Sequence, residues 1–87
     1  MKRFGVRWYA AARNRLAELY EQNPRIRQDI TEASDKIDRL LADDPLNVGV
    51  VQSGSFRQIV IPPLRVLYSV SVPDRSVTVI YLKFWEE

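Results

Sequence analysis

Cysteine and histidine are both absent from the 87 residues of this chain. Without cysteine there is no disulfide and no thiol nucleophile, and a zinc site would have to be built from carboxylates alone. Without histidine the chain lacks the side chain that most often transfers protons in catalysis near neutral pH. Any enzymatic chemistry must therefore depend on Asp, Glu, Lys, Arg or Tyr.

Long apolar segments and glycine-rich loops are missing as well. No apolar run approaches the roughly 20 residues that span a membrane, and residues 1–7 lack the apolar core of a signal peptide. We therefore expect a cytoplasmic protein with no membrane partner. Gly5, Gly49 and Gly54 are isolated, so there is no phosphate-binding loop. Because metal-ligand spacing is also absent, we expect neither a metal nor a small-molecule cofactor.

Charge is present but unevenly distributed. Residues 1–27 hold seven basic and two acidic side chains, whereas residues 28–45 hold two basic and six acidic ones. Most of the 13 basic residues are arginine, whose planar guanidinium suits contact with phosphate or carboxylate. Two interpretations remain open: a surface that faces phosphate or an acidic partner, and an ordinary solvated surface.

The apolar periodicity predicts the order of the secondary structure. Alternation over residues 4–8 indicates a short strand, and helical spacing indicates helices over 8–21 and 24–44. Asn23 and Pro24 are favoured at a helix start, and the bias against helix before Pro45 ends the second helix. With so short a connector, the two helices should form an antiparallel hairpin.

After Pro45 the period changes from 3.6 to 2, which indicates strands. We predict strands at 48–51, 56–61, 64–72 and 76–84, with a turn at 52–55. The last strand is apolar on both faces at most positions, so it should lie inside the sheet. The expected fold is a single two-layer α+β domain over residues 1–87, strand–helix–helix–four strands, with the helical hairpin on one face of a mostly antiparallel sheet.

Basic and tyrosine side chains on these strands are the best candidates for a site. Arg57 and Arg65 lie on neighbouring strands and are predicted to share a face, and Tyr81 and Lys83 lie two apart on the last strand. Such a cluster could bind a bent RNA backbone, stabilise charge on phosphate or stack on a base. In the alternative interpretation Tyr68 and Tyr81 belong to the core and Arg57 pairs with a carboxylate. Trp85 fits a core plug better than a partner contact.

Several short patterns occur in a fixed order along the chain. Ala12 and Leu16 lie in the first helix, the second helix closes at Asp44–Pro45, and Phe56–Arg57 enters a strand. The strongest pattern is an apolar residue, then Arg65, then a strand containing Tyr68, followed by a turn and a β-branched run at 75–80. In order and spacing, nearly the whole chain resembles the RelE/ParE family of type II toxins.

The resemblance implies a strand–helix–helix–four-strand fold and a toxin that is masked by a cognate antitoxin. One branch of the family cleaves mRNA in the ribosomal A site without a metal, so the implied partners are the ribosome and mRNA. Arg57, Arg65, Tyr81 and Lys83 are then the candidate catalytic residues. Another branch inhibits DNA gyrase without catalysis. A third possibility is a toxin-like fold that has lost its activity and only binds a partner.

Overall fold

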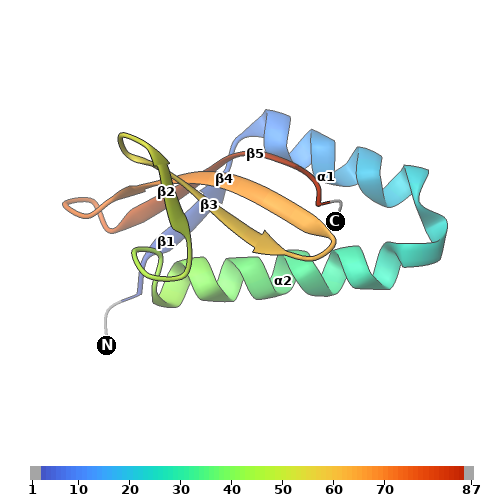
Figure 1. The fold of residues 1–87 in the computed structure, drawn as a ribbon, viewed down its shortest axis with the longest axis horizontal. Helices are drawn as coiled ribbons and strands as arrows, with labels where there is room; N and C mark the ends of the chain where they lie inside the picture. Colours follow the sequence, from blue (N-terminus) through green and yellow to red (C-terminus); the bar gives the residue numbers. More distant parts are fainter. Residues whose placement is uncertain (1–2, 86–87) are drawn as a thin grey trace.

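The computed structural model describes residues 3–85 of the chain. Its elements follow in the order β1 (Gly5–Trp8), α1 (Ala10–Gln22), the short 3-10 turn η1 (Pro24–Ile26), α2 (Arg27–Asp43), β2 (Val50–Ser53), β3 (Phe56–Ile61), β4 (Leu64–Ser71) and β5 (Ser76–Phe84). Figure 1 shows α1 and α2 joined as a hairpin at one end of the molecule. None of these helices is long and apolar enough to cross a membrane.

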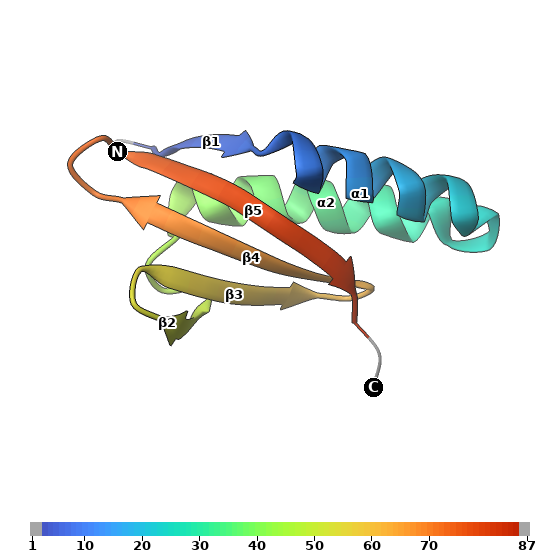
Figure 2. The same cartoon turned by 90° about the horizontal axis from the view of Figure 1, so that it is seen from above.

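The five strands form one sheet in the order β1-β5-β4-β3-β2. Figure 2 shows them side by side, with β1 at one edge and β2 at the other. The pairs β2–β3, β3–β4 and β4–β5 are antiparallel, and β1 runs parallel to β5. The α+β class, the order of the elements and the interior position of the last strand, all predicted from the sequence, are confirmed.

One face of the sheet packs against the helical hairpin and supplies the core. From the helices the core takes Ala12 and Leu19 of α1 and a stripe on α2, and from the sheet it takes alternate residues of β3, β4 and β5. The buried residues of the stripe and the sheet are Ile30, Ala33, Ile37, Leu41, Ile59, Leu64, Val66, Tyr68, Val77, Val79 and Leu82. Among residues 3–85 no helix covers the opposite face of the sheet.

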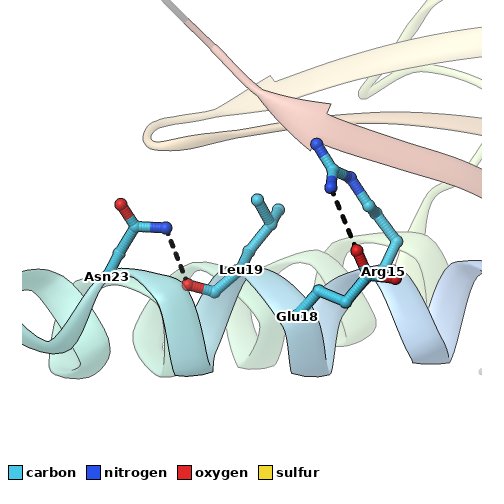
Figure 3. Close-up of polar contacts among 4 residues, drawn as sticks. All are labelled: Arg15, Glu18, Leu19 and Asn23. Atoms are coloured by element: carbon cyan, nitrogen blue, oxygen red, sulfur yellow. Dashed lines mark hydrogen bonds and ion pairs between the residues drawn. The ribbon is translucent and has the colours of Figure 1, made fainter.

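A side-chain cap separates the two helices. The Asn23 side-chain Nδ2 donates to the Leu19 carbonyl at 2.8 Å (Figure 3). This bond satisfies one of the carbonyls left free at the end of α1. Pro24 then opens η1, so α2 begins at Arg27, three residues later than the sequence pattern predicts.

The segment before β3 differs from its prediction. The strand runs over Val50–Ser53 rather than over 48–51, and the turn is confined to Gly54 and Ser55. Val48 packs against the core, and Gly49 lies against the Tyr68 hydroxyl. These two residues are therefore held by the core, and pairing with β3 starts only after them. Gly54 adopts φ 56°, the left-handed conformation that favours glycine in a tight turn.

An extra residue in β5 changes which side chains face the core. Leu67 pairs with Tyr81, but the next residue, Tyr68, pairs with Val79, so Ile80 has no partner on β4. This β-bulge shifts the alternation by one position. Strict alternation would place Tyr81 with Val77 and Val79. Instead Leu82 is the residue that joins the buried face, and Tyr81 turns to the open face.

Candidate functional site

Four side chains form a two-by-two array on the open face of the sheet. Arg65 and Leu67 come from β4, and their cross-strand partners on β5 are Lys83 and Tyr81 respectively. Directly paired residues on one face of an antiparallel sheet have Cβ atoms about 4.5–5.5 Å apart. Three of the four predicted site residues, Arg65, Tyr81 and Lys83, are therefore neighbours, and the prediction that Tyr81 and Lys83 share a face is confirmed.

The array forms the floor of an open hollow of about 340 Å³. The rest of its lining comes from β2 and β3, through Gln52, Ser53, Phe56 and Gln58. Phe56 and Tyr81 are 42% and 45% exposed, so their rings present apolar surface to solvent. The Gln52 amide donates to the Gln58 side-chain oxygen at 3.0 Å, which fixes the polar wall of the hollow.

The charged side chains that line this hollow within residues 3–85 are all positive. Like charges placed directly opposite each other in a sheet repel, yet Arg65 and Lys83 occupy such a pair. Within residues 3–85 neither forms an ion pair, and the lining of the hollow contains no acidic side chain. An anion bound between the two cations would relieve their repulsion. The exposed rings beside them would accept a stacked base.

Arg57 lies on the other side of the sheet. It pairs across the strands with Tyr68, which is fully buried against the helices, and not with a residue of the open face. Its Nη1 donates to the Leu46 carbonyl at 2.9 Å. The prediction that Arg57 and Arg65 share a face is therefore wrong. The register pairs Arg65 with Val60, so Arg57 falls on the opposite alternation of β3. The alternative of a carboxylate partner is also wrong, since the acceptor is a backbone carbonyl.

Tyr68 anchors the loop before β2 from inside the core. Its hydroxyl donates to the Pro45 carbonyl at 2.8 Å. Burial raises the pKa of the Tyr68 phenol above its ordinary value; the positive charge of Arg57 opposes this shift and the negative charge of Asp44 adds to it. The interpretation of Tyr68 as a core residue is confirmed. For Tyr81 the same interpretation is wrong, because the bulge turns it outward.

Two further residues join the site without having been predicted there. Arg15 of α1 and Trp85 line a second hollow together with Arg65 and Lys83. Arg15 lies at helical spacing between the buried Ala12 and Leu19, which places it near the covered face of α1, but this spacing does not indicate that it reaches the end of β5. Trp85 is 36% exposed and is not the core plug expected from the sequence.

Metal ligands are not gathered anywhere in the described part of the chain: no group of three or more Asp and Glu side chains there could hold a metal ion. What the site offers is positive charge, hydrogen-bond donors and exposed aromatic rings. Groups of these kinds can bind and orient phosphate and bases.

The architecture defines the class of fold: it is the one seen in solved RelE and ParE toxin–antitoxin structures. A chain of the toxin–antitoxin complex RelBE2 from Mycobacterium tuberculosis matches 100% of this chain over 97% of its own, with a TM-score of 0.80 and 21% identity. A chain of the chromosomal ParDE system of P. aeruginosa matches 95% of this chain over 97% of its own, with a TM-score of 0.76 and 12% identity.

The isolated E. coli RelE toxin is also similar. It matches 97% of this chain over 86% of its own, with a TM-score of 0.67 and 15% identity. No protein-family model matches the sequence, and no curated protein sequence matches it. The fold implied by the sequence resemblance is thus confirmed by structure, although the identity to these three chains is only 12–21%.

Proposed function

We propose that this protein is the toxin of a type II toxin–antitoxin pair, and that its open sheet face binds mRNA on the translating ribosome and promotes its cleavage. The observation that carries the proposal is the cross-strand pair Arg65–Lys83, unpaired with any acid among residues 3–85, beside the exposed ring of Tyr81. The fold supports it, because RelE and RelBE2 structures share the same arrangement of sheet and helices.

The proposed role of each residue in mRNA cleavage follows from the chemistry of its side chain. Arg65 and Lys83 would hold the scissile phosphate, and their charges would stabilise the negative charge that grows on its oxygens in the transition state. The adjacent ribose 2′-hydroxyl loses its proton to solvent water, and its oxygen attacks phosphorus in line. A 2′,3′-cyclic phosphate forms as the bond to the 5′-oxygen breaks. Tyr81 lies within the same array, where its hydroxyl can donate a proton to the departing 5′-oxygen. Holding the RNA in this in-line geometry contributes to the rate in addition to charge.

Primer extension on mRNA from a purified translation system tests the proposal. Wild-type protein should produce cuts at codons in the ribosomal A site, and Arg65→Ala and Lys83→Ala should each abolish them. Arg57→Ala serves as the matched control, because it removes the same charge from the opposite face of the sheet. Intact mRNA after addition of folded wild-type protein would refute the ribonuclease function.

A protein partner belongs to the same proposal. A cognate antitoxin with an acidic segment would cover the Arg65–Lys83 pair by charge complementarity and so block access to RNA. Co-expression with the neighbouring reading frame should yield a complex that withholds toxicity and protects mRNA. A neighbouring protein that neither co-purifies with this chain nor restores growth would refute the partnership.

A second function is favoured by one specific observation. Within residues 3–85 no Asp or Glu lines either of the two hollows that contain Arg65 and Lys83, and the sequence has no histidine, so no carboxylate or imidazole of the described part is placed there as a general base. A toxin that inhibits DNA gyrase by binding needs no such base, and the ParDE chain shares the fold. Inhibition of gyrase supercoiling at micromolar protein with mRNA left intact would select this function. Absence of both effects would leave a protein that only binds a partner.

A further inference from the structure

A second hollow, of about 420 Å³, lies where the end of β5 meets α1. Its lining consists of Arg15, Arg65, Lys83, Phe84 and Trp85. The pair Arg65–Lys83 lines the first hollow as well. The two hollows therefore share the Arg65–Lys83 pair as part of their lining. Arg15 adds a third positive charge to the second hollow.

The guanidinium of Arg15 is incompletely bonded. Figure 3 shows the side chain leaving α1 toward the ribbon of β5, with Nη1 linked to the Glu18 carboxylate. That contact is 3.4 Å long, whereas charge-assisted N–H···O bonds are usually about 2.7–2.9 Å. The Nε atom is buried and has no acceptor among residues 3–85. A buried donor without an acceptor is unfavourable, so the guanidinium of Arg15 keeps hydrogen-bonding capacity that no described residue uses.

The aromatic residues indicate which anion fits. Tyr81 is exposed in the first hollow and Trp85 in the second, so the cation pair has an exposed ring on each side. Cationic groups that follow a backbone, interleaved with rings on which bases stack, are typical of surfaces that bind single-stranded nucleic acid. An acidic peptide would use the charges but would gain little from the two rings.

We propose that the second hollow binds the neighbouring phosphate of a single-stranded RNA between Arg15 and the Arg65–Lys83 pair, with the adjacent base against Trp85. The inference rests on the RNA-binding role proposed for the first hollow, and it deepens that role in two ways. It makes the ligand at least two phosphates long, and it assigns α1, which lies outside the sheet, a part in RNA binding.

Titration calorimetry with two oligouridylates tests the inference. A dinucleotide has one phosphodiester and fills one hollow, whereas a hexanucleotide has five and reaches both. Arg15→Gln should weaken hexanucleotide binding about tenfold and lower the slope of log K against log salt by about 0.7, the value for one single-strand phosphate. It should leave dinucleotide binding unchanged. Arg65→Gln should weaken binding of both probes.

Arg13→Gln is the matched control. Arg13 lies on the same helix but lines the groove between α1 and α2, so its removal changes net charge equally and should leave both affinities unchanged. Arg15→Lys keeps the charge without the planar fork and should bind the hexanucleotide with intermediate affinity. Trp85→Leu should weaken only the longer probe. Thermal unfolding of each variant verifies that the fold is intact.

Two results would overturn the inference. One is equal hexanucleotide affinity for Arg15→Gln and Arg13→Gln. The other is Arg15-dependent binding of hexaglutamate with Arg15-independent binding of RNA, which would assign the hollow to a protein partner. Arg15-dependent RNA binding without mRNA cleavage would instead support the inference and refute the ribonuclease function, so the two proposals fail separately.

Discussion

Arg57 and Arg65, which the sequence pattern places on the same face of the sheet, should have different roles. Arg57 and Arg65 lie on adjacent strands, but Arg57 donates to the Leu46 carbonyl on the helix side and Arg65 lies opposite Lys83 on the open side. Replacing each by alanine should therefore separate stability from RNA binding. Arg57→Ala should destabilise the fold and spare the affinity. Arg65→Ala should do the reverse, because it removes one of two like charges that repel each other.

The magnitudes follow from the contacts that are lost. Arg57→Ala removes one hydrogen bond from a charged donor at a partly exposed site, which contributes about 1 kcal/mol to the free energy of unfolding. For a domain of 60–100 residues that corresponds to a melting temperature lower by about 4–8 °C. Arg65→Ala removes a charge-assisted contact to phosphate, about 1.5 kcal/mol, which is roughly tenfold in Kd.

Two measurements on the same protein preparations test whether Arg57 contributes to stability and Arg65 to RNA binding. Thermal unfolding gives the stability of each variant, and calorimetric titration with a hexauridylate gives its affinity at two salt concentrations. The reasoning is refuted if Arg57→Ala weakens RNA binding as much as Arg65→Ala while its melting temperature stays at the wild-type value. That outcome would place Arg57 on the RNA-binding face, which contradicts the register of β3 with β4.

Three further predictions concern the fold that supports the site. Gly49→Ala would bring a Cβ against the Tyr68 hydroxyl and within 2.8 Å of the Gln58 carbonyl, so urea unfolding should show a loss of about 1–3 kcal/mol. Burial raises the pKa of Tyr68 in the folded state. The difference in unfolding free energy between wild type and Tyr68→Phe should therefore be constant below about pH 10 and shrink above it. Urea denaturation that gives the same difference at pH 8 and pH 11 would contradict this. Asp38→Ala removes the acceptor of the Trp8 indole N–H at 2.8 Å, and urea unfolding should show a loss of about 1 kcal/mol.

The sequence was sufficient to predict most of the fold, and for physical reasons. The spacing on α2 reflects a single apolar stripe buried against the sheet, which fixes that helix and its orientation. The alternation between buried and partly exposed residues over positions 64–69 of β4 likewise matches one covered and one open face. Where one face of a helix or strand packs against the core and the other faces solvent, the alternation of apolar and polar residues predicts the element and its buried face.

The alternation of apolar and polar residues does not predict the register between neighbouring strands. Alternation places Arg57 and Arg65 on definite sides of their own strands, but it does not say which residues of β3 and β4 lie opposite each other. That depends on the length and geometry of the turn at Pro62 and Pro63. Pairing Arg57 with Tyr68 turned out to send it to the helix side. Arg15 was missed for a related reason, because α1 approaches the end of β5 only through the tertiary fold.

The bulge at Ile80 connects fold and site most directly. In a regular β5 the alternation that buries Val77 and Val79 would also direct Tyr81 and Lys83 toward the helices, where a lysine would be buried without a partner. The extra residue lets Leu82 fill the core and turns Tyr81 and Lys83 outward, opposite Leu67 and Arg65. Bulges are enriched next to functional sites because they re-aim side chains in this way. The pairing of Tyr81 and Lys83 with Leu67 and Arg65 on the open face therefore depends on the one residue by which β5 exceeds its partner strand.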